Sequence, residues 1–319
     1  MKMLDDEDTD LSKLLCIRNE EGRPVVRIGL LATMFLAEPY TRPEREAVTE
    51  AAEEYMLLAR DHLRWSQDRG GYFHPIDSGK VPFPREWLPQ HEDGQVWHLG
   101  FHGGDGDEDA SEFQVSALGA ERRPKPQFGY FQFYLPLTWF TEHPGTTFSA
   151  MVQHFANLLH PVSGYAGIGV LDSLDFSARQ DSGEIARKLA ERFPGLEVED
   201  YLGHSIYVGQ GIKGVNWLTL LGEHWVKEIG GLDYLRIRLG DDFKLTPYAG
   251  GVMIQAGPKP QIGDVTMNRW PRHYVTLAKV LKPIQVKTLG AFHRGDATRA
   301  TKRMDHAASL AWLFRFDGK

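Results

Sequence analysis

The sequence contains little cysteine, no long hydrophobic run and no excess of basic side chains. One cysteine, Cys16, occurs among 319 residues, which excludes an intramolecular disulfide framework and a thiolate-rich zinc site. No run of about 18 uncharged apolar residues is present, so the sequence predicts no membrane span and no membrane partner. The formal net charge is −7, whereas a general nucleic-acid binder needs a basic footprint.

The start of the chain also differs from an export signal. It reads MKMLDDEDTD, which is acidic where a secretory signal has a basic segment followed by an apolar one. Together with the single cysteine, this predicts a protein of the reducing cytoplasm. What the sequence does contain is 42% hydrophobic and 11% aromatic residues, which is enough apolar surface for a folded core.

Strand and helix patterns alternate along the chain and predict an α+β fold, with a mixed, largely antiparallel sheet and helices packed on it. The apolar run 25–36 and the aromatic run 128–137 indicate buried strands, and residues 148–159 have helical spacing. A similar order of elements on either side of residue 195 suggests two similar halves. Further strands are expected at 164–171, 217–221, 235–239, 243–247, 251–256 and 284–287, and further helices at 41–65, 172–194, 223–229 and 272–281.

Composition divides the chain into three parts. Residues 1–22 indicate an acidic, partly ordered lead-in, residues 23–290 a single domain, and residues 291–319 a basic C-terminal tail. Within the domain, residues 70–127 are rich in glycine, proline and histidine. That composition predicts an irregular loop region.

Two segments of this loop region carry specific expectations. The prolines of residues 81–89 argue against a regular helix and against a central strand, because proline lacks a backbone donor and has a fixed φ. The carboxylates of residues 103–109 predict an exposed loop, since so many adjacent charges are costly to bury together.

Residues 209–214 match the G-x-G-x-x-G pattern of dinucleotide-binding folds. In those folds the string leaves a strand and opens a helix, whose N-terminal N–H groups hold the pyrophosphate. Here it leads into the apolar run 217–221, which has the pattern of a strand. The string therefore predicts a glycine-rich turn, and no cofactor is expected.

His98 and His102 stand four residues apart, with His91 nearby. On a helix this spacing directs two imidazoles toward one metal ion, so a metal-assisted hydrolase that uses this region is one alternative function. Gly100 and Gly103 argue against a helix, and ordinary loop histidines are expected. No other catalytic constellation stands out, so no catalytic residue is predicted and the chain is not expected to be an enzyme.

Two glycine-rich blocks lie within residues 201–283. They read GIKGVNWLTLLG at 211–222 and GVMIQAG at 251–257, and the second is followed by PQIGDV at 260–265. In these blocks the sequence resembles the type VI secretion immunity protein family.

Two upstream segments fit the same family, HPVSGYAG at 160–167 and the aromatic strand near 130–139, so the resemblance extends over residues 23–290. It implies a bacterial cytoplasmic antitoxin, encoded beside a secreted toxin that it inactivates by direct binding. Some members are linked to nuclease toxins. Because the family's activity is binding, the resemblance implies no catalytic, metal-binding or cofactor-binding residue. Glycine and tryptophan positions of the blocks are expected to hold the fold, namely Gly214, Trp217, Gly230 and Gly257.

An acidic inhibitor suits a nuclease toxin, because a basic cleft for phosphate attracts carboxylates and is blocked by them. The partner-facing surface is expected in the loops of residues 72–115, with aromatic anchors and a charged rim. A non-toxin scaffold role in a secretion apparatus is a further alternative, with the same binding character and another partner. The candidate interface residues are Tyr72, Phe73, Trp87, Trp97, Asp105, Asp107, Glu108 and Asp109.

Overall fold

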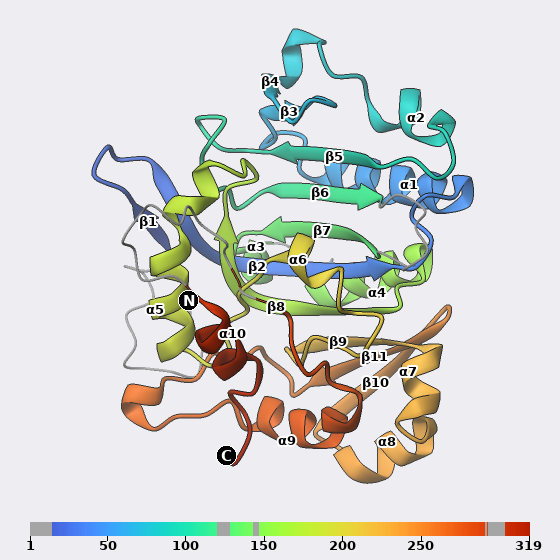
Figure 1. The fold of residues 1–319 in the computed structure, drawn as a ribbon, viewed down its shortest axis with the longest axis vertical. Helices are drawn as coiled ribbons and strands as arrows, with labels where there is room; N and C mark the ends of the chain where they lie inside the picture. The colour runs from blue at the N-terminus through green and yellow to red at the C-terminus, as the bar shows by residue number, and fades with distance from the viewer. Residues whose placement is uncertain (1–14, 120–127, 143–146, 291, 293–303) are drawn as a thin grey trace.

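The computed structural model describes residues 15–119, 128–142, 147–290, 292 and 304–319, and its centre is one large sheet (Figure 1). The strands are β1 (Cys16–Arg18), β2 (Pro24–Leu36), β3 (Trp65–Gln67), β4 (Phe73–Pro75), β5 (Trp97–His102), β6 (Gln114–Gly119), β7 (Gly129–Leu135), β8 (Ser163–Asp172), β9 (Leu218–Gly222), β10 (Phe243–Tyr248) and β11 (Gly251–Ala256). These eleven strands follow the order β10-β11-β9-β8-β2-β7-β6-β5-β3-β4, with β1 paired to β2. Each of their ladders is antiparallel, which confirms the predicted α+β fold with a largely antiparallel sheet.

Helices cover both faces of the sheet and its two ends (Figure 1). On one face lie α1 (Arg42–Leu58) and α4 (Phe148–Leu159), and on the other lie α5 (Gly183–Arg192), α6 (Tyr201–His204) and α10 (His306–Leu313). The short α3 (Trp139–Glu142) follows β7, and α2 (Pro84–Trp87) lies at the β4 end. At the β10 end lie α7 (Glu223–Glu228), α8 (Gly231–Leu239) and α9 (Arg272–Leu281). Single 3₁₀ turns complete the order, η2 (Ile76–Ser78), η3 (Leu88–Gln90), η4 (Ala178–Asp181), η5 (Val265–Met267) and η6 (Lys282–Ile284).

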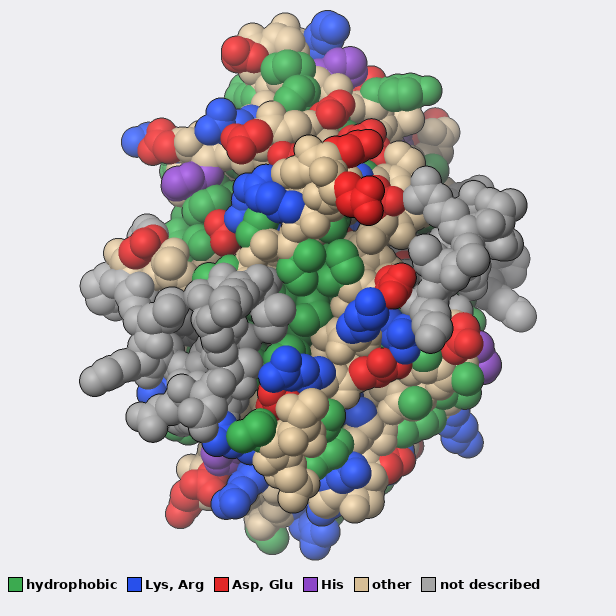
Figure 2. All heavy atoms as spheres, turned by 90° about the vertical axis from the view of Figure 1, so that its left-hand side faces the viewer, with side chains coloured by type: hydrophobic (Ala, Val, Ile, Leu, Met, Phe, Trp, Pro, Cys, Tyr) green, Lys and Arg blue, Asp and Glu red, His purple; other side chains and the backbone are tan. Residues whose placement is uncertain are grey.

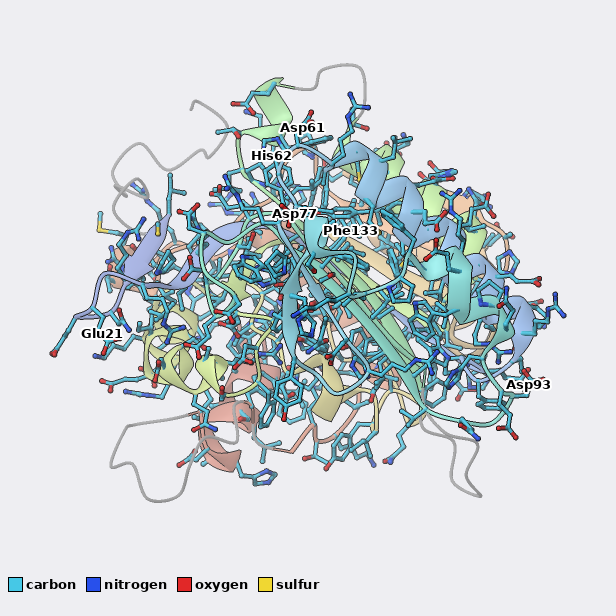
Figure 3. The ribbon with its side chains drawn as sticks, turned by 90° about the horizontal axis from the view of Figure 1, so that it is seen from above. Glu21, Asp61, His62, Asp77, Asp93 and Phe133 are labelled. Atoms are coloured by element: carbon cyan, nitrogen blue, oxygen red, sulfur yellow. The ribbon has the colours of Figure 1, made fainter. Side chains whose placement is uncertain are left out.

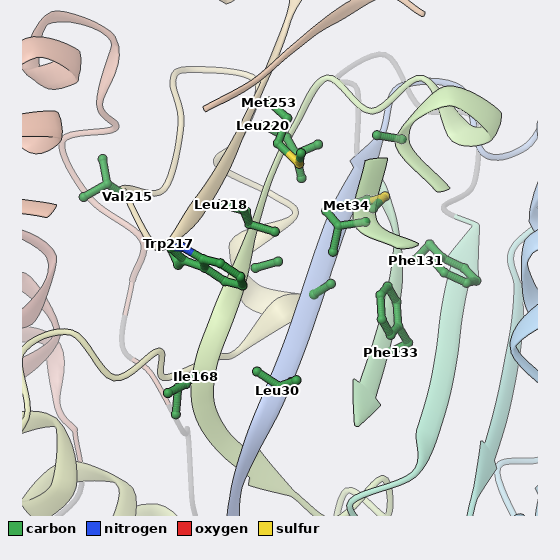
Figure 4. Packing of buried hydrophobic residues seen from close by; sticks show 14 of the residues in the cluster. Leu30, Met34, Phe131, Phe133, Ile168, Val215, Trp217, Leu218, Leu220 and Met253 are labelled. Atoms are coloured by element: carbon green, nitrogen blue, oxygen red, sulfur yellow. The ribbon is translucent and has the colours of Figure 1, made fainter. Parts of the chain in front are cut away.

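The central strand β2 explains the long apolar run of the sequence. It pairs with β7 on one side and β8 on the other, and both of its faces are covered. Leu30 and Met34 face the core that contains Phe131 and Phe133 (Figure 4). The alternate residues, such as Leu31, belong to a separate cluster on the opposite face. A strand that is buried on both faces carries apolar side chains on both, so its sequence is a continuous apolar run and does not alternate between apolar and polar residues.

Many predicted elements are confirmed. The predicted helices 148–159 and 272–281 and the strand 251–256 have the predicted bounds. The predicted strands 25–36, 128–137, 164–171, 217–221 and 243–247 correspond to β2, β7, β8, β9 and β10. The predicted helices 41–65 and 223–229 correspond to α1, which ends earlier, at Leu58, and to α7.

The strand predicted at 235–239 is wrong, because these residues belong to helix α8. Their apolar and basic residues alternate, yet Leu235 and Leu239 are buried while Ile237 between them is 81% exposed. Burial at positions four apart is the helical pattern, and five residues are too few to separate it from a strand. An ion pair from Arg236 to Asp233, three residues earlier, also suits the helix.

Three further expectations need correction. Residues 284–287 form no strand, since η6 is followed by a single bridge between Gln285 and Ile212. The helix predicted over 172–194 begins only at Gly183, after the turn η4. Residues 81–89 contain the short helix α2, with Pro84 in its first turn, where a missing N–H costs no hydrogen bond.

The region 70–127 is more regular than its composition predicts. It contains β4, β5 and β6, whose glycines and histidines hide the alternation of a strand. Gly100 on β5 is buried, and a Cβ there would lie 2.6 Å from a Leu174 methyl carbon. Residues 120–127 lie outside the described residues, as do 1–14 of the expected lead-in.

The expected structural role of Trp217 is confirmed. Its indole is 4% exposed and stacks on Phe148 with ring centroids 6.4 Å apart, and its Nε1 donates to the Gly257 carbonyl oxygen at 3.1 Å. Gly257 has a φ of +80°, and a Cβ there would lie 2.7 Å from His273. At Gly214 a Cβ would meet only a Gln285 nitrogen at 3.7 Å, so packing does not require glycine there.

Helix α10 lies within the segment 291–319 that composition sets apart as a tail. Its Trp312 and Leu313 are buried and belong to the main core cluster, as does Phe316. Residues 293–303, which carry four of the tail's basic side chains, lie outside the described residues. Among the described helices, none has the length and apolar character that crossing a bilayer requires.

Candidate functional site

The β4 end of the sheet carries most of the net charge of the chain. Residues 60–112 contain eleven Asp or Glu side chains against five Lys or Arg, a net charge of −6 out of −7 for the whole sequence. Figure 3 looks down on this end and shows Asp61, Asp77 and Asp93 spread across it. We call residues 57–112 the acidic end.

The acidic end also exposes hydrophobic side chains. Five of the ten exposed large hydrophobic residues among the described residues belong to it, Leu57, Leu58, Tyr72, Phe83 and Val96. Figure 2 shows acidic and hydrophobic side chains side by side over this upper part of the molecule. Exposed apolar groups within a charged rim are typical of a protein–protein interface.

The outer segment of the acidic end, residues 79–96, is fastened to helix α1. Arg45 on α1 is 2% exposed, and its Nη1 lies 2.7 Å from an Asp93 carboxylate oxygen. Arg85 on α2 reaches back to Glu53 of α1, with Nη2 and Oε2 2.6 Å apart. The exposed side chains of this segment are therefore presented from a fixed support.

The predicted aromatic anchors differ in exposure. Tyr72 is 72% exposed. Phe73 and Trp87 are half-buried, and the Arg69 guanidinium lies 5.3 Å from the centre of the Trp87 ring. Trp97 is only 2% exposed and donates from Nε1 to the Pro39 carbonyl oxygen at 2.8 Å. Trp97 thus fills the core beneath the acidic end and has no surface to offer a partner.

The predicted acidic residues divide in the same way. Asp105, Asp107 and Glu108 are exposed, and the carboxylate of Glu108 lies 3.8 Å from Arg23. The expectation of a fully exposed loop is wrong for Asp109, which is 6% exposed. Its Oδ2 accepts a hydrogen bond from the Gly106 N–H at 2.9 Å, so the loop's own backbone solvates the buried carboxylate.

The structure does not bring His91, His98 and His102 together. His98 Nε2 lies 2.9 Å from the Asp68 carbonyl oxygen, and His91 Nε2 lies 3.2 Å from the Val96 carbonyl oxygen. His98 and His102 are on β5, where four residues span roughly 13 Å. No group of three or more potential metal ligands occurs among the described residues.

His102 serves the acidic loop in another way. The ring is buried, and burial lowers the pKa of His102 to about 4. Its Nδ1 accepts a hydrogen bond from the Gly104 N–H at 3.2 Å, and the Phe73 ring meets it edge-on with centroids 4.9 Å apart. A neutral imidazole thus supports the loop that carries Asp105 and Asp107.

A second polar constellation is buried, and sequence reasoning missed it. Lys213 and Glu197 are 3% and 2% exposed, and Lys213 Nζ lies 2.6 Å from Glu197 Oε1. The same Nζ donates to the Val198 carbonyl oxygen at 2.8 Å, and Asn216 Nδ2 donates to Glu197 Oε2 at 2.9 Å. Lys213 belongs to the glycine-rich string, which is a turn, as predicted. The Lys213 ammonium group faces a carboxylate inside the protein.

Glu199 extends this buried constellation to the sheet. Its two carboxyl oxygens accept hydrogen bonds from Thr33 Oγ1 on β2 and Gln132 Nε2 on β7, both at 2.5 Å. Burial is the main reason that the pKa of Glu199 is raised from 4.5 to about 7, and the nearby Lys213 offsets part of this effect. Because its side chains are all buried, the constellation has the character of a structural core.

Glu199 should make the fold less stable as pH rises. Its pKa is higher in the folded state, so the unfolded chain releases the proton first, and the stabilising contribution present below pH 4.5 is lost by about pH 7. The expected loss is about 3 kcal/mol. We expect Glu199→Gln to lack this decline, as measured by urea unfolding of both proteins at pH 5 and pH 8. Equal pH profiles for the two proteins would contradict it.

Comparisons with known proteins give two findings. Residues 47–316 match the model of a family described as TsiV, type VI immunity for VRR-NUC. Among solved structures, the Pseudomonas aeruginosa T6SS protein PA0821 is similar, with a TM-score of 0.84 and 25% identity over 98% of this chain and 92% of that chain. No curated protein matches the chain.

Proposed function

We propose that this chain, which belongs to the family of type VI immunity proteins for VRR-NUC, is an immunity protein that neutralises a cognate nuclease toxin by direct binding. The observation that carries this proposal is the acidic end, where a net charge of −6 lies within one segment of the chain. Its place of action is the cytoplasm, because the nucleic acid that the toxin attacks is there.

A nuclease must offer phosphate groups a basic surface, and the acidic end is complementary to such a surface. Carboxylates gathered at one end of a molecule steer it toward a basic cleft and raise the association rate. Once bound, they occupy the positions of phosphates and exclude the substrate. A specific complex of this kind buries on the order of 800 Å² on each partner.

The proposed contact residues are those that the structure leaves accessible. Tyr72, Asp105 and Asp107 are exposed, Phe73 and Trp87 are half-buried, and Glu108 is exposed next to Arg23. Trp97 and Asp109 support this surface from beneath, through their hydrogen bonds to backbone groups.

A titration tests the proposal directly. The purified chain, added to its cognate nuclease and a DNA substrate, should abolish cleavage at one equivalent, and co-expression with the toxin should restore growth. Inhibition by blockade saturates at stoichiometric ratio, whereas a hydrolase would act at small fractions of an equivalent. His98→Ala removes a hydrogen bond to the Asp68 carbonyl oxygen and should leave inhibition stoichiometric at saturating concentrations, whereas a hydrolase that used His98 would lose its activity. Failure of the wild-type chain both to form a complex and to restore growth would refute the proposed function.

A further inference from the structure

The turn between β3 and β4 is held by an unusual concentration of hydrogen bonds on one side chain. Asp68 Oδ1 accepts from the backbone N–H groups of Gly70 at 2.8 Å and Tyr72 at 3.0 Å. The Asp68 N–H donates to the Tyr72 carbonyl oxygen at 2.9 Å, and the Gly71 N–H donates to the Asp68 carbonyl oxygen at 3.0 Å. Gly71 has a φ of +89°, which suits glycine. Residues 68–72 therefore form one closed turn.

A second set of contacts ties this turn to the sheet. His74 Nε2 on β4 lies 2.8 Å from Asp68 Oδ2, and His98 Nε2 on β5 lies 2.9 Å from the Asp68 carbonyl oxygen. Gln67 Nε2 donates to the Gly71 carbonyl oxygen at 3.1 Å. The hydrogen bond with His74, together with the two backbone N–H groups, lowers the pKa of the Asp68 carboxyl. Asp68 is thus ionised at neutral pH, and its carboxylate oxygens accept hydrogen bonds from other groups of the chain.

This rigid turn presents a single aromatic side chain to solvent. Tyr72 is 72% exposed, the largest exposed fraction of any described aromatic residue. Its neighbour Phe73 is half-buried and packs edge-on against buried His102. Burying an exposed aromatic ring is favourable, and a ring whose backbone is already fixed loses little entropy on binding.

We infer that the turn 68–72 is a pre-formed anchor and that Tyr72 contributes more to toxin affinity than any other single side chain of the acidic end. The inference rests on the proposed function and adds which side chain anchors the toxin. Channels for nucleic acid combine a basic track with surfaces on which bases stack. The exposed ring of Tyr72 offers the flat aromatic face that a stacked base offers. Asp68 is a positioning residue, since it acts through the backbone of Tyr72.

The first test is the removal of the ring. Tyr72→Ala should weaken the complex with the cognate nuclease by about 30-fold or more, mainly through faster dissociation. Tyr72→Phe should stay within a few-fold of wild type, because stacking needs the ring and not the hydroxyl group. Tyr234→Ala is the matched control, since Tyr234 is a 37% exposed tyrosine on α8 at the opposite end of the sheet. Surface plasmon resonance measures all four proteins.

The second test separates positioning from charge. Asp68→Asn keeps an oxygen acceptor for the Gly70 and Tyr72 N–H groups, whereas Asp68→Ala removes it. We expect Asp68→Ala to weaken binding about 10-fold and to speed hydrogen exchange at both amides. Asp68→Asn should rescue most of both effects. Equal losses in the two variants would show that the charge matters and would overturn the positioning role.

The outcomes distinguish the anchor from the proposed function. A Tyr72→Ala variant that binds within twofold of wild type, while Asp105→Lys with Asp107→Lys prevents binding, would overturn the anchor and leave blockade by charge intact. A wild-type chain that forms no complex with the nuclease would remove the proposed function itself.

Discussion

Lys213→Met should destabilise the fold by about 3–5 kcal/mol, because it leaves a buried carboxylate without its cation. Lys213 Nζ lies 2.6 Å from Glu197 Oε1, and neither side chain is more than 3% exposed. The ammonium group also lies 4.4 Å from the centre of the Tyr165 ring and 5.2 Å from that of Trp312. Its loss therefore removes an ion pair and loosens the docking of helix α10.

Two comparisons identify the cause of this loss. Lys213→Met with Glu197→Gln removes both charges and keeps an acceptor for Asn216, so this double variant should be more stable than Lys213→Met alone. At pH 5 the penalty of Lys213→Met should shrink, since Glu199, whose pKa burial raises to about 7, is then neutral and one fewer buried negative charge lacks a cation. Urea unfolding of each protein measures both effects. A Lys213→Met chain within 1 kcal/mol of wild type at pH 7 would show that the pair is dispensable.

The elements that the sequence predicts well are those whose pattern is local. Strand β2 and helix α4 each carry enough apolar residues for their period or continuity to be read without knowing their neighbours. The same reasoning fails for helix α8, because the positions of Leu235 and Leu239 fit both the strand and the helix pattern over five residues. Leucine and arginine also favour a helix, and α8 packs against α9.

The buried constellation could not be predicted because its partners are distant in sequence. Glu197 and Lys213 are sixteen residues apart, and each alone is a residue type that is usually exposed. One signal was present, since Glu197, Glu199 and Lys213 are, with Asp200, the charged residues of the stretch 195–215, which is otherwise largely apolar and glycine-rich. The sequence does point to the acidic end, because its charges are contiguous. Contact with Pro39 buries Trp97, and such a contact is invisible in a local pattern.

Reversing two exposed charges of the acidic end should prevent protection without disturbing the fold. Asp105→Lys with Asp107→Lys changes the net charge of residues 60–112 from −6 to −2, at side chains that project into solvent. We expect the association rate with the cognate nuclease to fall by at least about 10-fold at low salt. The free energy of unfolding should stay within about 0.5 kcal/mol of wild type, as for other exposed sites. Stopped-flow association and urea unfolding measure the two quantities.

The chain offers a matched control for this charge reversal at its opposite end. Asp241 and Asp242 are also two nearby exposed aspartates, in the turn before β10, and their replacement by lysine changes the net charge of the whole protein equally. If the field of the whole molecule steers association, both double variants slow it alike. If the acidic end itself enters the basic cleft, only Asp105→Lys with Asp107→Lys slows association. Measurements at increasing salt concentration separate steering from contact. Screening should narrow the difference in association rate between the two variants. A difference in dissociation rate that persists at high salt requires the two carboxylates to contact the toxin.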